Sequence, residues 1–162
     1  MIWHVAVELN EIAALGRAYA WPRPEPCLGC GRFKVWGHGF VERYFDEVDG
    51  PVLLRCYRCP GCRCVVTPRP EGFFRRVRSA AACIRCHLAQ RLGTGRWPAS
   101  SAQNTSRLRH WLRNLRRQAL AWFGWTRSTE LLAAFDRLGG MDLVPVGRAI
   151  QRGKRDRRHP PQ

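Results

Sequence analysis

The pattern of apolar and polar positions divides the chain into a β-rich first part and a helical second part. Between Cys27 and Pro70, short runs of aromatic and branched residues alternate with turn-forming residues, which predicts short strands joined by tight turns. The expected strands are 34–36, 40–45 and 52–57, and the expected turns are 37–39 and 49–51. Before them, a strand-like run at 2–9, a short helix at 11–19 and an extended proline-rich segment at 21–26 are predicted.

After Phe73 the apolar residues take the spacing of helices. We predict one helix over residues 73–92 ended by the glycines at 93 and 95, a short one over 99–102, and a last one over 129–138 ended by Gly139 and Gly140. The tail at 151–162 is basic and is predicted to be disordered.

The clearest predicted helix is Ser106–Phe123. Its apolar residues keep the i, i+3, i+4, i+7 spacing of one buried stripe: Leu108, Trp111, Leu112, Leu115, Ala119 and Trp122. Residues 104–106 offer side-chain oxygens for the N-cap, and Gly124 is a natural stop. Most arginines of this helix fall off the stripe, so we expect them to face solvent.

The charges separate the same two parts. The 162 residues carry 28 Lys and Arg against 12 Asp and Glu, a net charge of +16. Residues 72–127 contain twelve Arg and no acidic residue, whereas residues 1–71 hold eight of the twelve acidic residues and are near neutral. Soluble surfaces usually mix the two signs, so a block of one sign is typical of a protein that contacts nucleic acid.

Two cysteine pairs share a knuckle pattern, with a glycine inside each pair: Cys27/Cys30 and Cys59/Cys62. Each pair places two thiolates on a tight turn, and two such turns supply the four ligands of tetrahedral zinc. The long stretch between the pairs leaves room for a hairpin, and so small a sheet needs the metal in order to fold. The sequence therefore predicts a structural Zn²⁺ site in a zinc ribbon.

The other four cysteines leave alternatives open. Cys56 has the same spacing to Cys59 and can replace Cys62 in the second pair, although the interior Pro-Gly favours the 59/62 turn. A candidate second metal site combines residues of both parts: Cys56, Cys64, Cys83, Cys86 and His87. The alternative is that these cysteines are buried apolar residues. The Cys-x-x-Cys-His letters at 83–87 also match a c-type haem attachment signature, which requires an exported protein.

The Arg-rich helix is the second functional signal. Preceded by the helices expected at 73–92 and 99–102, it resembles the recognition helix of a helix-turn-helix, which lies in the major groove of DNA. The expected DNA contacts are Arg107, Arg109, Arg113, Arg116 and Arg117, with Arg75, Arg76 and Arg78 as weaker backbone contacts. The alternative is an amphipathic helix that touches only phosphates or a membrane surface.

Together these motifs resemble a known group: small proteins and transposase N-terminal regions of bacterial insertion sequences, in which a zinc ribbon precedes a helix-turn-helix. The matching residues lie within 26–124 and are Cys27-Leu-Gly-Cys30-Gly31, Trp36-Gly-His-Gly-Phe40, Arg43-Tyr44, Arg55, Tyr57-Arg-Cys-Pro-Gly-Cys-Arg63, Thr67-Pro68 and Ser106-Arg-Leu-Arg-His-Trp111. The resemblance implies DNA binding in a mobile-element context, with Cys27, Cys30, Cys59 and Cys62 as zinc ligands. It fades after Gly124, and no catalytic carboxylate domain follows, so a complete transposase is not expected.

No catalytic site is predicted. A zinc ion saturated by four thiolates keeps no open position for a substrate. His38 has no acidic partner at a recognisable spacing, and Asp46, Glu47 and Asp49 cluster in a turn-rich segment where solvated charge is the rule. We therefore expect a protein that is not an enzyme.

The sequence predicts an α+β protein, a small antiparallel zinc ribbon followed by a helical, helix-turn-helix-like domain. The expected segments are 1–24 (strand and helix), 25–70 (zinc ribbon), 71–125 (Arg-rich domain), 126–150 (C-terminal helix) and 151–162 (basic tail). The expected function is zinc-stabilised binding of duplex DNA, with a protein of a mobile-element machinery as a further partner. The alternatives are an RNA-binding or ribosome-associated zinc-ribbon protein and a protein-docking adaptor.

No run approaches the roughly 18 apolar residues of a membrane helix, and no basic stretch precedes an apolar run at the N-terminus. A cytoplasmic protein with reduced thiols is therefore expected.

Overall fold

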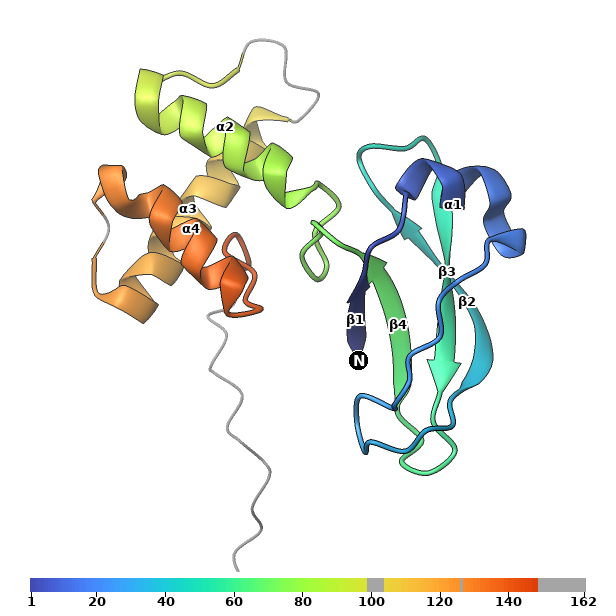
Figure 1. Ribbon diagram of the computed structural model, residues 1–162. Coiled ribbons are helices and arrows are strands. Elements are labelled where there is room, and N and C mark those ends of the chain that lie inside the picture. The colour runs from blue at the N-terminus through green and yellow to red at the C-terminus, as the bar shows by residue number, and fades with distance from the viewer. Residues whose placement is uncertain (99–103, 126, 149–162) are drawn as a thin grey trace, which may run out of the picture. The chain divides into compact units, whose positions relative to one another are not determined.

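The computed structural model describes residues 1–98, 104–125 and 127–148 (Figure 1). The chain forms two compact units, residues 1–81 and residues 82–162. The first unit combines a four-stranded sheet with a short helix, and the second is helical where it is described, so the fold is α+β. The short helix expected at 99–102 and the tail at 151–162 lie outside the described residues. No helix in the described part of the chain has the length and apolar character to cross a membrane.

The sheet has the strand order β1-β4-β3-β2. The strands are β1 (Ile2–Val5), β2 (Trp36–Tyr44), β3 (Pro51–Arg58) and β4 (Val65–Pro70). β2 and β3 form an antiparallel hairpin, and β4 pairs antiparallel with the other side of β3. β1 pairs with β4 in parallel, with Ile2 opposite Thr67. The antiparallel ribbon therefore carries an additional parallel strand from the start of the unit.

The turn predicted at residues 37–39 is wrong, because these residues lie inside β2. The pairing of β2 with β3 shifts its register between Gly37 and Phe40. Gly39 takes a φ of 93°, in the region that L side chains avoid. The glycines thus permit an irregularity within the strand, and the hairpin turn lies after Tyr44.

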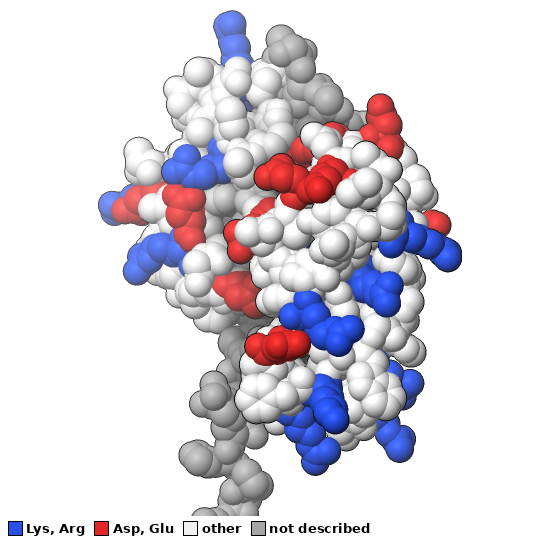
Figure 2. All heavy atoms as spheres, turned by 45° about the vertical axis from the view of Figure 1, so that its right-hand side comes forward, with Lys and Arg blue, Asp and Glu red and all other residues white. Residues whose placement is uncertain are grey.

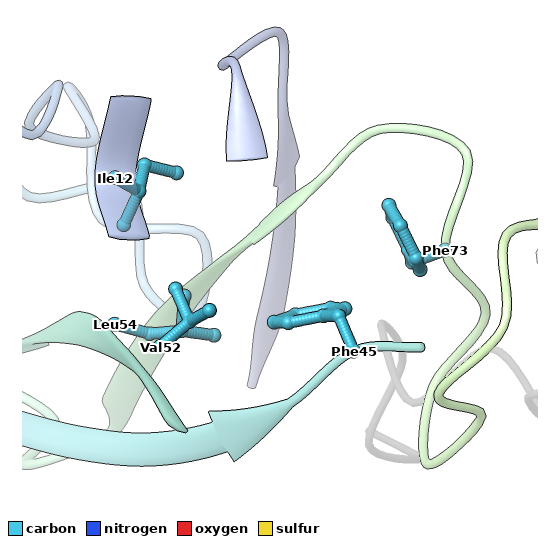
Figure 3. Packing of buried hydrophobic residues seen from close by; sticks show 5 residues of the cluster. All are labelled: Ile12, Phe45, Val52, Leu54 and Phe73. Atoms are coloured by element: carbon cyan, nitrogen blue, oxygen red, sulfur yellow. The ribbon is translucent and has the colours of Figure 1, made fainter. Parts of the chain in front are cut away.

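A small apolar core lies between the sheet and α1 (Leu9–Leu15), which continues into the 3₁₀ turn η1 (Gly16–Ala18). Figure 3 shows its buried side chains, which are Ile12, Phe45, Val52, Leu54 and Phe73. The rings of Phe45 and Phe73 meet edge to face, with their centroids 4.8 Å apart. The core therefore joins the start of the unit, the hairpin and the segment after β4.

The helix predicted to start at Phe73 starts later, and α2 spans Ala81–Thr94. Phe73 belongs to the core of the first unit. The buried Arg69 donates through Nε to the carbonyl of Phe73 at 3.1 Å and through Nη2 to the carbonyl of Val77. These contacts hold residues 73–80 in turns, so tertiary packing overrides the helical pattern of the sequence.

The second unit contains α2, α3 (Thr105–Phe123), the 3₁₀ turn η2 (Ser128–Glu130) and α4 (Leu131–Gly140). The predicted caps of α3 are confirmed, because Asn104 Oδ1 accepts a hydrogen bond from the amide of Ser106 at 2.8 Å and Gly124 ends the helix with a φ of 73°. Its predicted apolar stripe is buried except for the half-buried Trp122. The helix predicted over 129–138 forms as η2 and α4, and Gly139 and Gly140 are its last residues.

Two polar residues on α3 are buried as well. Asn114 donates to the carbonyl of Val146 at 3.0 Å, and Gln118 donates to the carbonyl of Gly147 at 3.2 Å. These bonds fix the segment after α4 against α3. Because buried backbone carbonyls need a donor, the two amides give this segment a defined place in the unit.

Candidate metal centre and basic surfaces

The two cysteine knuckles have the same backbone design. The carbonyl of Cys27 accepts a hydrogen bond from the amide of Gly31 at 2.8 Å, and the carbonyl of Cys59 accepts one from the amide of Arg63 at 2.9 Å. The residue that closes each turn has a positive φ, 73° at Gly31 and 60° at Arg63. The second knuckle therefore holds an arginine where the first holds a glycine.

The four thiols predicted as ligands come together in the first unit. Cys27, Cys30, Cys59 and Cys62 have their sulfur atoms within 4.8 Å of one another. The Cys27–Cys62 and Cys30–Cys59 sulfur pairs are 3.7 and 3.6 Å apart. Zinc–sulfur bonds of about 2.3 Å in a tetrahedron place the sulfurs about 3.8 Å apart. The four cysteines therefore can hold a metal ion, and their geometry fits zinc.

The backbone around Cys27 favours its thiolate form. The amide of Gly29 donates to Cys27 Sγ at 3.4 Å, and this hydrogen bond is the main cause that lowers the pKa of Cys27 to about 6. Gly29 also has little space for a side chain, because a Cβ there would lie 3.1 Å from Cys64 Sγ and 3.4 Å from Cys62 Sγ. The glycine of the first knuckle thus lets the backbone approach the sulfur atoms.

Cys64 lies beside this cluster. Its sulfur is 3.5 Å from Cys27 Sγ, and burial raises the pKa of the Cys64 thiol. A tetrahedral ion takes four ligands, and the four knuckle sulfurs already approach one another in that arrangement. Cys56 faces elsewhere, with its sulfur 3.5 Å from the hydroxyl of Thr67. The 59/62 pair, rather than 56/59, therefore forms the second knuckle.

The other candidates for a second metal site lie on α2 in the second unit. The sulfur of Cys83 is 3.4 Å from Nδ1 of His87, which also lies 2.7 Å from the carbonyl oxygen of Cys83. Cys86 is exposed. Among the described residues, the knuckle cysteines are the one group of three or more such ligands within 4.8 Å. Within the described part of either unit no second group of this kind forms, and a site that combines both units stays a prediction.

A basic groove lies in the second unit. It has a volume of about 520 Å³, and it is lined by Arg91 and Trp97 together with Leu112, Arg109, Arg113, Arg116 and Arg117 of α3. The guanidinium of Arg91 lies over the ring of Trp97, 5.5 Å from its centroid. Four of the five arginines predicted on α3 as DNA contacts therefore line one groove. The sequence did not predict that Arg91 and Trp97 also line this groove.

A second hollow, of about 530 Å³, lies at the start of α3. Its lining comprises Ser106, Arg107, Arg109, His110, Arg113 and Arg148. Burial, Arg148 and Arg113 lower the pKa of His110. This shift favours the uncharged ring, whose Nδ1 can accept a hydrogen bond from Arg113 Nη2 at 2.9 Å. His110 thereby orients one of the arginines that line both hollows.

The three arginines before α2 that were predicted as weaker contacts to the DNA backbone differ in their surroundings. Arg78 lies 3.4 Å from the carboxylate of Asp46 and over the ring of Tyr44. Arg75 and Arg76 are exposed and line a separate small pocket on the first unit. Two of the three acidic residues between β2 and β3 have structural partners, because Asp46 binds the hydroxyl of Ser79 and Glu47 accepts from the amide of Ala80 at 2.8 Å.

Residues 95–104 connect α2 to α3. A helix-turn-helix joins its two helices by a turn of about three to four residues. The helix-turn-helix is therefore not confirmed by the described elements. Comparison of the chain with protein-family models, with curated proteins and with solved structures finds no match.

Proposed function

We propose that this protein binds duplex DNA through the exposed face of α3, and that a zinc ion stabilises its first unit. The observation that carries the proposal is the groove in which four arginines of α3 meet Arg91 and Trp97. Residues 72–127 contain no acidic residue, so nothing within that stretch neutralises these charges. Guanidinium groups pair with phosphates and with guanine edges, which suits a duplex partner.

The order of the side chains on α3 supports contact with a groove of DNA. Arg109, Arg113, Arg116 and Arg117 are exposed on one side, while Leu108 and Leu115 are buried on the other. A helix so docked presents its arginines at a fixed spacing, as a recognition helix does in the major groove. The placement of α3 as the second helix of a helix-turn-helix, and the link to a mobile element, rest on the sequence resemblance.

Zinc is the metal that the knuckles favour. Four thiolates are a soft donor set, and a saturated tetrahedral sulfur site is typical of structural zinc. Such an ion would cross-link the two knuckles and keep no position open for a reacting group. The metal would therefore serve the fold.

The test is to remove two groove charges together. Arg109 and Arg113 line both hollows of the second unit, so we expect R109Q/R113Q to weaken duplex binding by about tenfold or more, since each bidentate base contact is worth about 1–3 kcal/mol. The binding constant is measured by fluorescence anisotropy, on a duplex selected from a random pool by the zinc-loaded protein. The slope of the salt dependence should flatten by about 0.9 for each phosphate that the variant no longer neutralises.

The matched control is R96Q/R127Q, which removes the same charge from the same unit. Arg96 and Arg127 are exposed and lie outside both hollows. We expect this control to keep most of the affinity. Equal losses of affinity in the two variants would show that net charge, rather than the α3 face, determines the binding, and the proposal would fail.

A second candidate function is binding of single-stranded or structured RNA at the knuckle end of the first unit. Phe33 is 81% exposed and Trp36 is 63% exposed, and Trp36 stands opposite the exposed Arg58 across the hairpin. Residues 26–41 and 50–70 contain no acidic residue. Figure 2 shows Lys and Arg grouped toward the lower end of this face and few acidic side chains there. Exposed aromatic rings beside cations can stack on unpaired bases.

A direct competition separates the two candidates. Zinc-loaded protein is bound to the selected labelled duplex and challenged with unlabelled structured RNA of equal length and at equal salt. RNA that binds more weakly than the duplex favours the α3 face and duplex DNA. RNA that binds more tightly than the duplex, with an affinity that W36A lowers and R109Q/R113Q leaves unchanged, favours the knuckle end.

A further inference from the structure

A small cationic pocket lies on the first unit, beside β1, β4 and the turn that follows β4. It has a volume of about 270 Å³, and its lining includes Arg43, Arg69, Arg75, Arg76, Thr67 and Pro68. None of the described residues that line it is acidic. Pockets for drug-sized ligands start at about 300 Å³. This pocket therefore suits a small polar ligand of negative charge.

Arg69 is the buried member of this set, and only 6% of it is exposed. It donates to the carbonyls of Phe73 and Val77, which leaves three of its five N–H groups without a partner among the described residues. Buried charges are normally paired with an opposite charge. Arg69 instead has Arg43 nearby, and burial together with that second charge lowers the pKa of Arg69 to about 10.

Arg75 and Arg76 border the same pocket from the turn. Their side chains make no hydrogen bond or ion pair with any residue that the structure describes, whereas Arg78 of the same turn pairs with Asp46. Arg76 has a φ of 60°, which L residues other than asparagine and aspartate rarely adopt. The turn therefore places an arginine in a backbone conformation that glycine would adopt more easily.

We propose that this pocket binds a phosphate group, held by Arg69 of β4 and by Arg75 and Arg76 of the turn. Guanidinium forks bind phosphate oxygens in pairs, and a phosphate would supply the opposite charge that Arg69 lacks. The proposal is independent of the α3 face, because the pocket belongs to the other unit. The phosphate can belong to a small phosphorylated molecule or to the end of a nucleic-acid strand.

The test uses the full zinc-loaded chain and two matched variants. Arg76 and Arg63 both have a φ of 60° and both lie in the first unit, but only Arg76 lines the pocket. R76G and R63G therefore each remove one positive charge, and each places a glycine at a positive φ that arginine rarely adopts. Inorganic phosphate is titrated while the side-chain Nε–H signal of Arg69 is followed by NMR. Melting temperatures report whether each variant is as stable as the parent protein.

We expect a saturable shift of the Arg69 signal in the parent protein and in R63G. In R76G the affinity for phosphate should fall about tenfold, since hydrogen bonds to charged groups are among the strong ones. R109Q/R113Q should keep the phosphate response, which separates this proposal from the function proposed for α3. A signal that does not saturate, or equal phosphate affinities in R76G and R63G, would overturn the proposal.

Competition then identifies the source of the phosphate. Displacement by a 5′-phosphorylated oligonucleotide, but not by the same strand without its phosphate, assigns the pocket to a strand end. Displacement by a nucleoside monophosphate at the same concentration as the phosphorylated strand assigns it to a small molecule. Either result supports a phosphate site.

Discussion

The two units differ in how far along the chain their stabilising contacts reach. In the first unit, β1 pairs with β4 across more than sixty positions, and the knuckles that precede β2 and follow β3 meet at the open end of the hairpin. In the second unit, consecutive helices bury a stripe of α3, and the segment that follows α4 binds back to it. A small sheet whose buried side chains form two small clusters depends on cross-links between distant residues, whereas a helical unit obtains most of its stability from apolar packing.

The comparison is tested most strongly by removing one metal ligand. We expect C59S to lose the metal and to unfold the first unit, because three thiolates no longer saturate the ion and the core of that unit is small. The helical signal of the second unit in circular dichroism should persist. Metal content by elemental analysis and the thermal unfolding curve measure the two effects.

C64S serves as the control for this change. Cys64 lies beside the cluster without being one of its four members, so C64S should still bind one zinc ion per chain. Loss of the metal in C64S but not in C59S would mean that Cys64 is a ligand and Cys59 is not.

The reverse experiment removes apolar volume from the second unit. Leu115 of α3 is fully buried, and we expect L115A to lower the free energy of unfolding of this unit by about 2–5 kcal/mol. The metal content of the first unit should not change. L120A is the matched control, because Leu120 is 57% exposed on the same helix and should alter stability by no more than about 0.5 kcal/mol. Similar losses of stability in the two variants would contradict the assigned buried face.

A smaller effect is expected from the polar contact between α3 and the segment after α4. In N114A the carbonyl of Val146 loses its donor. An unsatisfied buried polar group lowers the free energy of unfolding by about 1–3 kcal/mol. Hydrogen exchange should become faster at residues 143–148 while the middle of α3 stays protected. Q90A, at an exposed position on α2, should leave exchange in residues 143–148 as it is in the parent protein. Unchanged exchange in N114A would mean that the hydrogen bond does not hold the segment.

The sequence predicted features that depend on neighbouring residues. The knuckle spacing located the four thiols, and the periodicity of α3 located its buried stripe and both of its caps. Each knuckle turn, the stripe and the caps follow from local geometry, in which the spacing of side chains along a turn or helix decides which of them meet. The meeting of the two knuckles was inferred from the four ligands that tetrahedral zinc needs.

Features that depend on distant partners were not predicted. Nothing in residues 2–5 indicates that they pair in parallel with residues 67–70. The sequence pattern predicts a helix from Phe73, but Phe73 is buried in the core of the first unit and α2 starts at Ala81. The groove combines Arg91 and Trp97 with residues of α3 that lie further along the chain, so no motif contains all of its members. The cationic pocket likewise gathers arginines from two strands and a turn.

The parallel pairing of β1 with β4 also has a kinetic consequence. β1 can pair only after residues 67–70 have been brought back to it, whereas α3 can form within its own nineteen residues. Pairing of distant segments is slow because the intervening loop must first be closed. In refolding experiments on the metal-loaded protein, the helical unit should therefore acquire its structure first, and completion of the sheet should set the slower rate.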